Sequence, residues 1–277
     1  MEKMIDNGVL NVTHNSGFFS CCNVRLSKII EYFNKFKKEP RVLNCKTQFA
    51  YFKNDPFDIN EDLNLLFFKK YKTFDDIPYV KDIIISDAEY SDFQFTPYYK
   101  INFDELKPFI EKYYSLSDEI LNLITSDTVK YNINYDKTIG VCYRGNDKHG
   151  ETNIASYDDF LKKCSEVYNK NADCVFFLQT DEKEFSNEFY KQFPNTFHLE
   201  KIPQISHDKN KVIHSLIYDK HRPMFGCMIL ASIFMLSQCK HVITHSGNCG
   251  MWITLFRSGV KNVHQFLHHH NSNINWF

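Results

Sequence analysis

Several motifs that identify common enzyme classes are absent from this chain of 277 residues. It contains no Walker phosphate loop and no Gly-x-Gly-x-x-Gly fingerprint, which disfavours P-loop nucleotidases and classical dinucleotide-binding enzymes. It also lacks a Gly-x-Ser-x-Gly nucleophile elbow and a Cys-x-x-Cys pair. The chemistry must therefore be sought in less common arrangements of polar residues.

Long apolar runs and long basic runs are absent as well. Residues 1–8 lack the apolar core of a signal peptide, and no apolar run approaches the length of a membrane span. We therefore expect a soluble, cytoplasmic protein without a membrane anchor. The 33 Lys and Arg are balanced by 34 Asp and Glu and interleaved with them, which argues against a nucleic acid partner. Nothing in the sequence indicates an oligomeric state.

The nine cysteines do not form a disulfide pattern, because their number is odd and they are scattered. Most lie in apolar surroundings, which favours free, buried thiols in a reducing compartment. Cys142 lies within an apolar strand-like run, so we predict a core position for it and not a nucleophilic role. They are Cys21, Cys22, Cys45, Cys142, Cys164, Cys174, Cys227, Cys239 and Cys249.

The first part of the chain opens with a predicted strand at residues 8–14, a helix at 21–36 and a strand at 41–45. The loop at 15–20 then follows a strand, where ligands often bind. A tight loop whose phenylalanines pack into the core is an equally good interpretation. Further along, we predict helices at 59–71, 103–114 and 117–124, a strand at 79–85 and an aromatic loop at 87–99. That loop could stack on sugar rings or form a small core.

The second part alternates strands and helices. Strands are predicted at residues 139–143, 174–178, 196–199, 241–244 and 262–266, and helices at 156–169, 182–192, 225–237 and 248–258. This alternation indicates parallel βαβ units in a Rossmann-like sheet. The polar, aperiodic segment at 127–137 is interpreted as a connection. We therefore predict an N-terminal domain of residues 1–130 and a C-terminal domain of residues 131–277.

Polar clusters follow three of these strands: residues 144–151, 179–181 and 245–250. Because the carboxyl ends of parallel strands share one edge of a sheet, these loops should converge there. Arg144 could bind two oxygens of a phosphate or carboxylate with its planar fork, or it could stiffen a surface loop by pairing with an aspartate. The segment around Gly247 could offer backbone N–H groups to a phosphate at a helix start, or it could be an ordinary Ser or Asn cap.

Two further polar segments have less specific interpretations. Residues 214–222 could line the same cleft or form a solvated loop. His268, His269 and His270 cannot all point to one site from a strand, so we predict a solvated tail for them.

Three segments, residues 143–148, 177–181 and 236–248, resemble the motifs of the fucosyltransferase superfamily in their order and spacing. This superfamily includes α1,6- and α1,2-fucosyltransferases, protein O-fucosyltransferases and bacterial Nod-factor fucosyltransferases. The resemblance covers residues 139–258. It implies an α/β, GT-B-like fold in which two Rossmann-like domains face a cleft. The C-terminal domain would hold a nucleotide-sugar donor, usually GDP-fucose, and the N-terminal domain a glycan or glycosylated acceptor.

The resemblance also implies roles for individual residues. Arg144 matches the arginine that binds the β-phosphate of the donor and stabilises the leaving group. The other donor-binding positions are Asp147 and Lys148 in the same motif, Asp181 near the nucleotide, and Ser246, Gly247 and Asn248 at the phosphate-binding helix start. In the α1,6 branch a glutamate soon after the first motif acts as the base. Glu151 fits that role with one residue of offset, and His149 and His14 are alternatives.

An inverting sugar transfer needs a base for the acceptor hydroxyl and positive charge where the diphosphate leaves. Many GT-A enzymes use a metal held by an Asp-x-Asp motif for the second task. No Asp-x-Asp occurs here, so we expect Arg144, Lys148 and the Ser246 helix start to act without a metal or another cofactor. Two other hypotheses are the same scaffold with a different donor, such as a UDP-sugar, and a non-catalytic module that binds a glycan or a nucleotide.

Overall fold

The computed structural model describes residues 8–58, 61–70, 96–206, 221–268 and 275–276. The strand predicted at 79–85, most of the aromatic loop at 87–99 and most of the polar segment at 214–222 lie outside these ranges.

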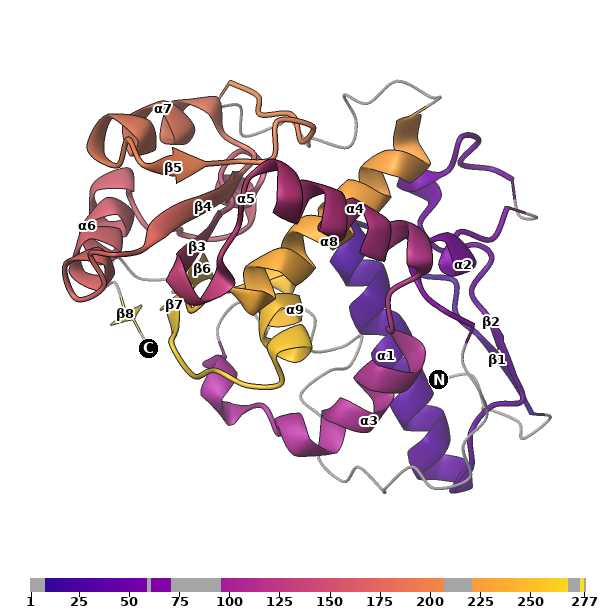
Figure 1. Cartoon of the computed structure of the whole chain (residues 1–277). Helices are drawn as coiled ribbons and strands as arrows, with labels where there is room; N and C mark the ends of the chain where they lie inside the picture. The colour runs from indigo at the N-terminus through magenta and orange to yellow at the C-terminus, as the bar shows by residue number, and fades with distance from the viewer. Residues whose placement is uncertain (1–7, 59–60, 71–95, 207–220, 269–274, 277) are drawn as a thin grey trace.

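A six-stranded sheet forms the frame of the second half of the chain (Figure 1). Its strands lie in the order β5-β4-β3-β6-β7-β8, and all neighbours except β7 and β8 are parallel. The strands are β3 (Thr138–Tyr143), β4 (Val175–Thr180), β5 (Thr196–Phe197), β6 (His241–His245), β7 (Val263–Leu267) and β8 (Asn275–Trp276). The predicted parallel, Rossmann-like sheet is therefore confirmed. The two residues of β8 are too few to show any periodicity in the sequence.

Helices cover both faces of this sheet. Successive side chains of a strand point to opposite faces, so Val141 and Tyr143 of β3 pack with Phe160 and Phe185, while Cys142 between them joins the core on the other side. The first face carries α6 (Tyr157–Asn169) and α7 (Lys183–Gln192), and the second carries α8 (Arg222–Gln238) and α9 (Asn248–Arg257). The buried position predicted for Cys142 is confirmed.

The first half of the chain contains a short parallel pair of strands, β1 (Val9–Asn11) and β2 (Val42–Asn44), on either side of the long helix α1 (Phe18–Phe36). This is the strand, helix and strand order predicted from the sequence. The remaining elements are η1 (Ala50–Phe52), α2 (Asn64–Phe67), η4 (Tyr98–Lys100), α3 (Phe103–Tyr113), α4 (Asp118–Lys130) and η5 (Tyr135–Lys137). The predicted α/β class is therefore confirmed, with parallel strand pairing in both halves of the chain.

Two element predictions in this half are wrong in extent. Within residues 61–70 the helix predicted at 59–71 is reduced to the four residues of α2. Helix α4 starts where predicted, with the Ser117 hydroxyl accepting from the N–H of Ile120, but it continues to Lys130, into the segment interpreted as a connection. Tertiary contacts favour this extension, because α4 packs against α8 and the Asp127 carboxylate accepts a hydrogen bond from Lys201 at 3.2 Å.

The two halves share one hydrophobic core, in which α8 and α9 pack against α4, α1 and α3. A polar contact ties α1 to α9 inside it. The side-chain oxygen of the buried Asn23 accepts from Nε1 of Trp252 at 2.6 Å, and its amide nitrogen donates to the side chain of Asn248. This contact sets the position of the α9 N-terminus relative to the start of α1.

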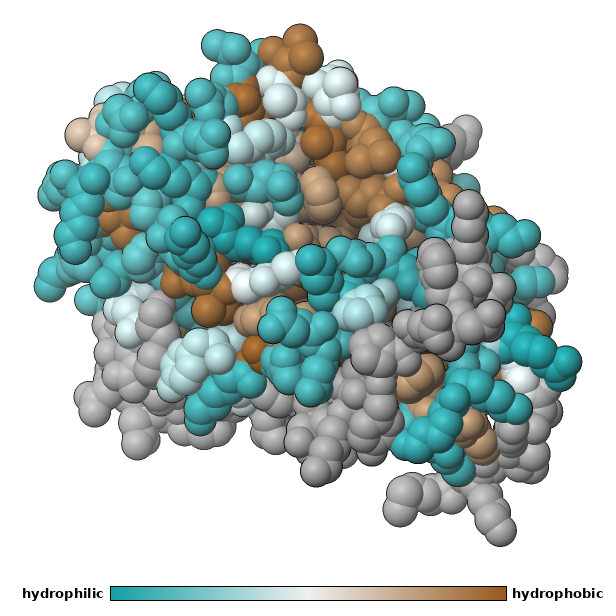
Figure 2. All heavy atoms as spheres, turned by 60° about the horizontal axis from the view of Figure 1, so that its bottom comes forward, coloured by the Kyte–Doolittle hydropathy of each residue, from teal (hydrophilic) through white to brown (hydrophobic). Residues whose placement is uncertain are grey.

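The surface shown in Figure 2 is largely hydrophilic, with hydrophobic side chains gathered in a patch near its upper centre. Among the described residues, no helix combines the length and the apolar character that crossing a membrane requires.

The Asn23 contact leads to a stability prediction. Asn23→Ala leaves the N–H of the fully buried Trp252 without its acceptor, and an unsatisfied buried donor costs about 1–3 kcal/mol. We expect urea denaturation to give a free energy of unfolding lower by that amount. Gln192→Ala, which removes an exposed amide bonded to Ser165, should change it by less than about 0.5 kcal/mol. Equal effects of the two substitutions would contradict this role of Asn23.

Candidate active site

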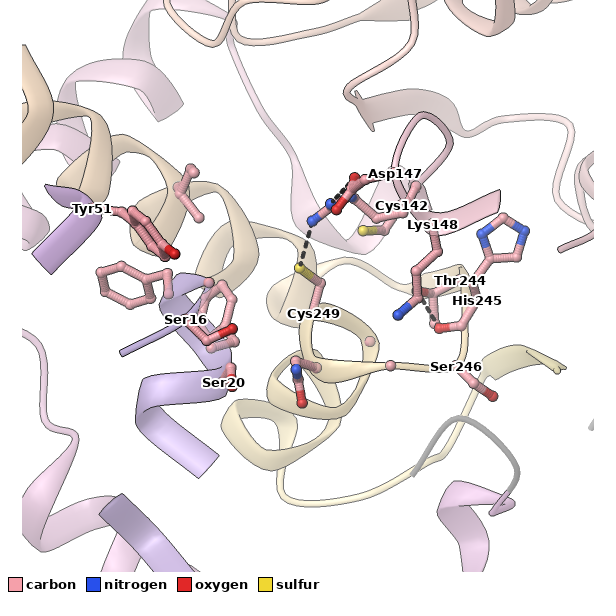
Figure 3. A pocket seen from close by; sticks show the side chains of 18 of the residues that line it. Ser16, Ser20, Tyr51, Cys142, Asp147, Lys148, Thr244, His245, Ser246 and Cys249 are labelled. Atoms are coloured by element: carbon pink, nitrogen blue, oxygen red, sulfur yellow. Dashed lines mark hydrogen bonds and ion pairs between the residues drawn. The ribbon is translucent and has the colours of Figure 1, made fainter. Parts of the chain in front are cut away.

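A cavity of about 350 Å³ lies between the two halves of the chain, at the carboxyl edge of the six-stranded sheet. In Figure 3 Tyr51, Ser16 and Ser20 lie on one side of it, and Asp147, Lys148 and Cys249 on the other. The first half contributes Ser16, Gly17, Phe18, Phe19, Ser20, Tyr51 and Phe52. The second half contributes Cys142, Arg144, Asp147, Lys148, Ile229, Thr244, His245, Ser246, Gly247, Asn248, Cys249 and Gly250. Two of the three polar clusters that follow strands in the sequence thus line one cavity, and the third adjoins it.

Arg144 follows β3 directly and is held at the cavity by two carboxylates. Its Nε donates to Asp181 at 3.1 Å and its Nη2 donates to Asp147 at 3.0 Å. Burial opposes its charge, but Asp181 and Asp147 raise the pKa of Arg144 above its usual value, so it stays protonated. Its side chain remains 35% exposed. The Arg–Asp pairing considered from the sequence therefore exists, and it fixes a charged group whose remaining surface is accessible from the cavity.

Asp181 is turned toward the Arg144 loop and is only 4% exposed. Besides Arg144, its carboxylate accepts from the backbone N–H of Gly145 at 2.9 Å, and its carbonyl accepts from the side chain of Asn146 at 2.9 Å. In this structure Asp181 therefore positions Arg144. Contact with a nucleotide, which the resemblance implies for this residue, stays a prediction.

Glu182 is a second acidic residue beneath the same loop, and sequence reasoning missed it. It is fully buried and accepts from the N–H of Asn146 at 3.1 Å and from the hydroxyl of Tyr157 at 2.8 Å. A Cβ atom on Gly145 would come within 2.0 Å of its carboxyl carbon, which explains the glycine at this position. A sequence cannot distinguish such a carboxylate from the exposed ones at other helix starts.

The turn between β6 and α9 forms the floor of the cavity beside Arg144. Gly247 caps the helix with a φ of 113° and a ψ of 179°, a backbone region essentially restricted to glycine. The first N–H groups of a helix have no partner within it, and no side chain caps this one. The alternative of an ordinary Ser or Asn cap is therefore wrong. The Lys148 ammonium lies over the turn, 3.6 Å from where a Gly247 Cβ would be.

The side chains on either side of Gly247 are bonded to other residues of the chain. The Ser246 hydroxyl donates to the carbonyl of Phe266 at 3.1 Å and accepts from Gln265 at 2.7 Å, and Figure 3 shows it directed outward. The N–H of Ser246 also donates to Phe266, at 2.9 Å. Asn248 is bonded to Asn23, as described above. The backbone N–H groups after Gly247 are therefore available to a ligand at this turn, and contact of a ligand with the Ser246 or Asn248 side chain stays a prediction.

Tyr98, from the aromatic loop, braces this turn from behind. It is buried, and its hydroxyl donates to the carbonyl of Gly247 at 2.8 Å. Gln265 accepts from the N–H of Tyr98 at 2.7 Å and donates to Thr96 at 3.1 Å. For Tyr98, the core interpretation of the aromatic loop is the one that the structure supports.

The candidate bases lie in different places. His14 does not line the cavity, but its Nε2 lies 2.8 Å from the hydroxyl of Ser20, which does. His149 lies 4.0 Å from the buried Glu182, outside the cavity lining. Glu151 ends the short helix α5 (Lys148–Glu151), which the sequence did not predict, and its side chain lies outside the part that the structure describes.

Beneath the turn, His245 is buried in an aromatic cage. Its ring lies 4.7 Å from Tyr143, 4.8 Å from Phe160 and 5.4 Å from His268. Burial lowers the pKa of His245 well below its usual value, and His268 adds to this effect. The prediction of a solvated tail is wrong for His268, which is fully buried in this cage, while His269 and His270 lie outside the described residues.

In the part of the chain that the structure describes, no group of three or more His, Cys, Asp or Glu side chains could hold a metal ion.

No protein-family model matches the sequence, and no curated protein matches it. The fold, in contrast, matches solved structures of NodZ. The structure of NodZ alpha-1,6-fucosyltransferase soaked with GDP-fucose has a TM-score of 0.58 and 14% identity, over 97% of this chain and 98% of that one. The structure co-crystallised with GDP has a TM-score of 0.57 and 14% identity, over 97% of both chains. NodZ from Bradyrhizobium has a TM-score of 0.58 and 13% identity, over 97% and 98%. The fucosyltransferase-like fold implied by the sequence motifs is therefore confirmed.

The contact between Gly145 and Glu182 predicts that the Arg144 loop cannot accept a side chain there. Gly145→Ala should lower the free energy of unfolding by about 1–3 kcal/mol, since the new methyl group must displace a fully bonded carboxylate. The control is Gly17→Ala, whose added Cβ meets nothing within 4 Å at a φ of −55°. Because Gly17 is the N-cap of α1, where glycine is preferred over alanine, we expect chemical denaturation to show a loss below about 1 kcal/mol for this variant. A Gly145→Ala protein as stable as the control would contradict this packing.

The cage around His245 predicts a loss of stability in acid. In the unfolded chain a histidine takes up a proton below about pH 6.5, whereas buried His245 does not. The free energy of unfolding that the buried, neutral His245 contributes is therefore present above about pH 6.5 and is lost as the pH falls below that value. Between pH 7.5 and 5.5, His245→Phe should lose about 1 kcal/mol less unfolding free energy than the wild type. Urea titrations at both pH values measure this difference, and equal losses would refute it.

Proposed function

We propose that this chain is a glycosyltransferase that moves a sugar from a nucleoside diphosphate donor to a glycan or glycosylated acceptor, with GDP-fucose as the donor. One observation carries the proposal. A charged, carboxylate-held Arg144, the Lys148 ammonium and the N-terminus of α9 converge on one wall of a cavity between two α/β halves. The fold in which they converge is also that of NodZ, of which structures exist with GDP-fucose and with GDP.

The donor diphosphate would lie against this wall. The backbone N–H groups after Gly247 and the positive end of the α9 dipole favour an anion there. Arg144 can reach phosphate oxygens with the part of its guanidinium that Asp147 and Asp181 leave exposed. Lys148 adds a second positive charge directly above the turn.

The reaction would proceed with inversion. The acceptor oxygen attacks the anomeric carbon while the bond to the diphosphate breaks, and the leaving group keeps the electron pair and gains negative charge. Arg144, Lys148 and the α9 N-terminus are arranged where that charge develops, so they stabilise the transition state more than the ground state. The proposal needs no metal ion for this step. We also propose that the protein is cytoplasmic. In this proposal the first half of the chain supplies the side of the cavity that binds the acceptor.

Arg144→Ala tests the catalytic part of the proposal. We expect the rate of GDP release from GDP-fucose, alone and with a panel of oligosaccharide acceptors, to fall by about 100- to 1,000-fold. Arg144→Lys keeps the charge but loses the planar fork, so an intermediate rate is expected. Arg41→Ala removes an exposed arginine outside the cavity lining and should leave the rate unchanged. Equal rates in the wild type and Arg144→Ala would remove Arg144 from the mechanism.

Thermal shifts with GDP, UDP and ADP test the identity of the donor. A ligand that binds only the folded state, present at 100 times its Kd, stabilises the protein by about 2.7 kcal/mol. We expect such a shift with GDP. Stabilisation by UDP alone would refute the GDP assignment, and GDP binding without any sugar release would indicate a non-catalytic nucleotide-binding module.

A further inference from the structure

A histidine–serine pair lies where the first half of the chain meets the cavity. Ser20 lines the cavity and is only 2% exposed, and its hydroxyl lies 2.8 Å from Nε2 of His14, which is itself outside the lining. In Figure 3 Ser20 lies on the side away from Asp147 and Lys148. One member of the pair therefore lines the cavity, and the other holds an imidazole nitrogen within hydrogen-bond distance of its hydroxyl.

Several contacts hold the pair in place. Gly17 is the N-cap of α1, and its carbonyl accepts from the N–H of Ser20 at 3.0 Å. The Cys21 thiol lies 3.5 Å from the carbonyl of His14 and donates to it. The side chain of Asn15, which follows His14, accepts from the N–H of Ala50 at 3.1 Å. This bond ties the loop to the short helix that bears Tyr51. Such fixed geometry is what proton transfer to or from a substrate requires.

We propose that Ser20 and His14 form a proton relay for the acceptor hydroxyl, an inference that rests on the proposed function. As the acceptor oxygen bonds to the anomeric carbon, its proton passes to the Ser20 oxygen while the Ser20 proton passes to Nε2 of His14. The bond from the anomeric carbon to the diphosphate breaks at the same time, and GDP leaves with the electron pair. The imidazolium then releases its proton to water, which restores the pair.

The geometry of an inverting displacement indicates on which side of the cavity the acceptor binds. In an inverting displacement the acceptor enters on the side of the sugar opposite the leaving group. The leaving diphosphate is assigned to the side of Arg144 and Lys148, and Ser20 lies apart from Lys148 in Figure 3, so the acceptor oxygen is assigned to the side of Ser20. His149 lies beside the buried Glu182, on the Arg144 loop, and belongs to the donor wall. The first turn of α1, where Ser20 lies, also favours negative charge developing on the acceptor oxygen.

Tyr51 indicates the class of acceptor. Its ring is 45% exposed and lines the cavity on the same wall as Ser16 and Ser20 (Figure 3). An aromatic ring at the mouth of a cavity offers a flat apolar surface with a polar tip. The reacting hydroxyl is therefore assigned to a ring that has an apolar face, such as a pyranose, which can lie on Tyr51 while its hydroxyl reaches Ser20.

The relay is tested by turnover of GDP-fucose with the full chain, both as hydrolysis, in which water takes the acceptor position, and as transfer to the oligosaccharide panel. Ser20→Ala and His14→Gln should each lower the rate at saturating donor by about 100-fold, a typical contribution of acid–base catalysis. The Kd for GDP should stay within about twofold of the wild type, because neither residue lies on the donor wall. Ser20→Thr should retain most of the activity, and added imidazole should partly restore His14→Ala.

The control is His241→Gln, a histidine at the start of β6 whose Nε2 lies 3.1 Å from the side chain of Asn171. It should turn over GDP-fucose like the wild type. Wild-type rates in Ser20→Ala or His14→Gln would overturn the relay, as would a parallel loss of GDP affinity, which would indicate a structural role. A wild-type protein that neither binds GDP nor turns over GDP-fucose would refute the proposed function itself, which separates the two failures.

Discussion

The ion pairs that Arg144 makes with two carboxylates are the interaction on which the cavity depends. A guanidinium at a strand end would be costly to desolvate alone, but Asp181 and Asp147 offset that cost and leave one side of the group exposed. Because Asp181 and Glu182 also bind the backbone of residues 145 and 146, the loop has no freedom to swing away. The positive charge is thus already in place before any ligand binds, and this preorganisation is what transition-state stabilisation requires.

Helix α9 couples this charged wall to the opposite one. Its N-terminus forms the turn proposed to bind the diphosphate, while Trp252, one turn further along, bonds to Asn23 of α1. Asn23 lies three residues after Ser20, so the same helix that holds the proposed acceptor wall is tied to the helix that holds the donor wall. Tyr98 fixes the turn from a third side. The positions of these elements around the cavity are therefore set by buried hydrogen bonds inside one shared core.

The places where sequence reasoning went wrong have a common physical cause. The lengths of α2 and α4 depend on packing against α8, which local periodicity does not contain. A solvated tail is predicted for His268 because three adjacent histidines cannot all face one site from a strand, yet the aromatic cage around His245 offers it a buried position. In each case a partner distant in sequence decides the outcome.

The sequence by itself determined the parallel α/β sheet, the resemblance to fucosyltransferases and the choice of Arg144, because strand periodicity and strand-end polar clusters are local patterns. The tertiary structure alone decided which groups meet in the cavity. The burial of Glu182 beneath the Arg144 loop and the bond from Tyr98 to Gly247 arise only where segments distant in sequence meet. Such convergence depends on the packing of α9 against α1 and of the loops against the sheet edge, which no local stretch of residues encodes.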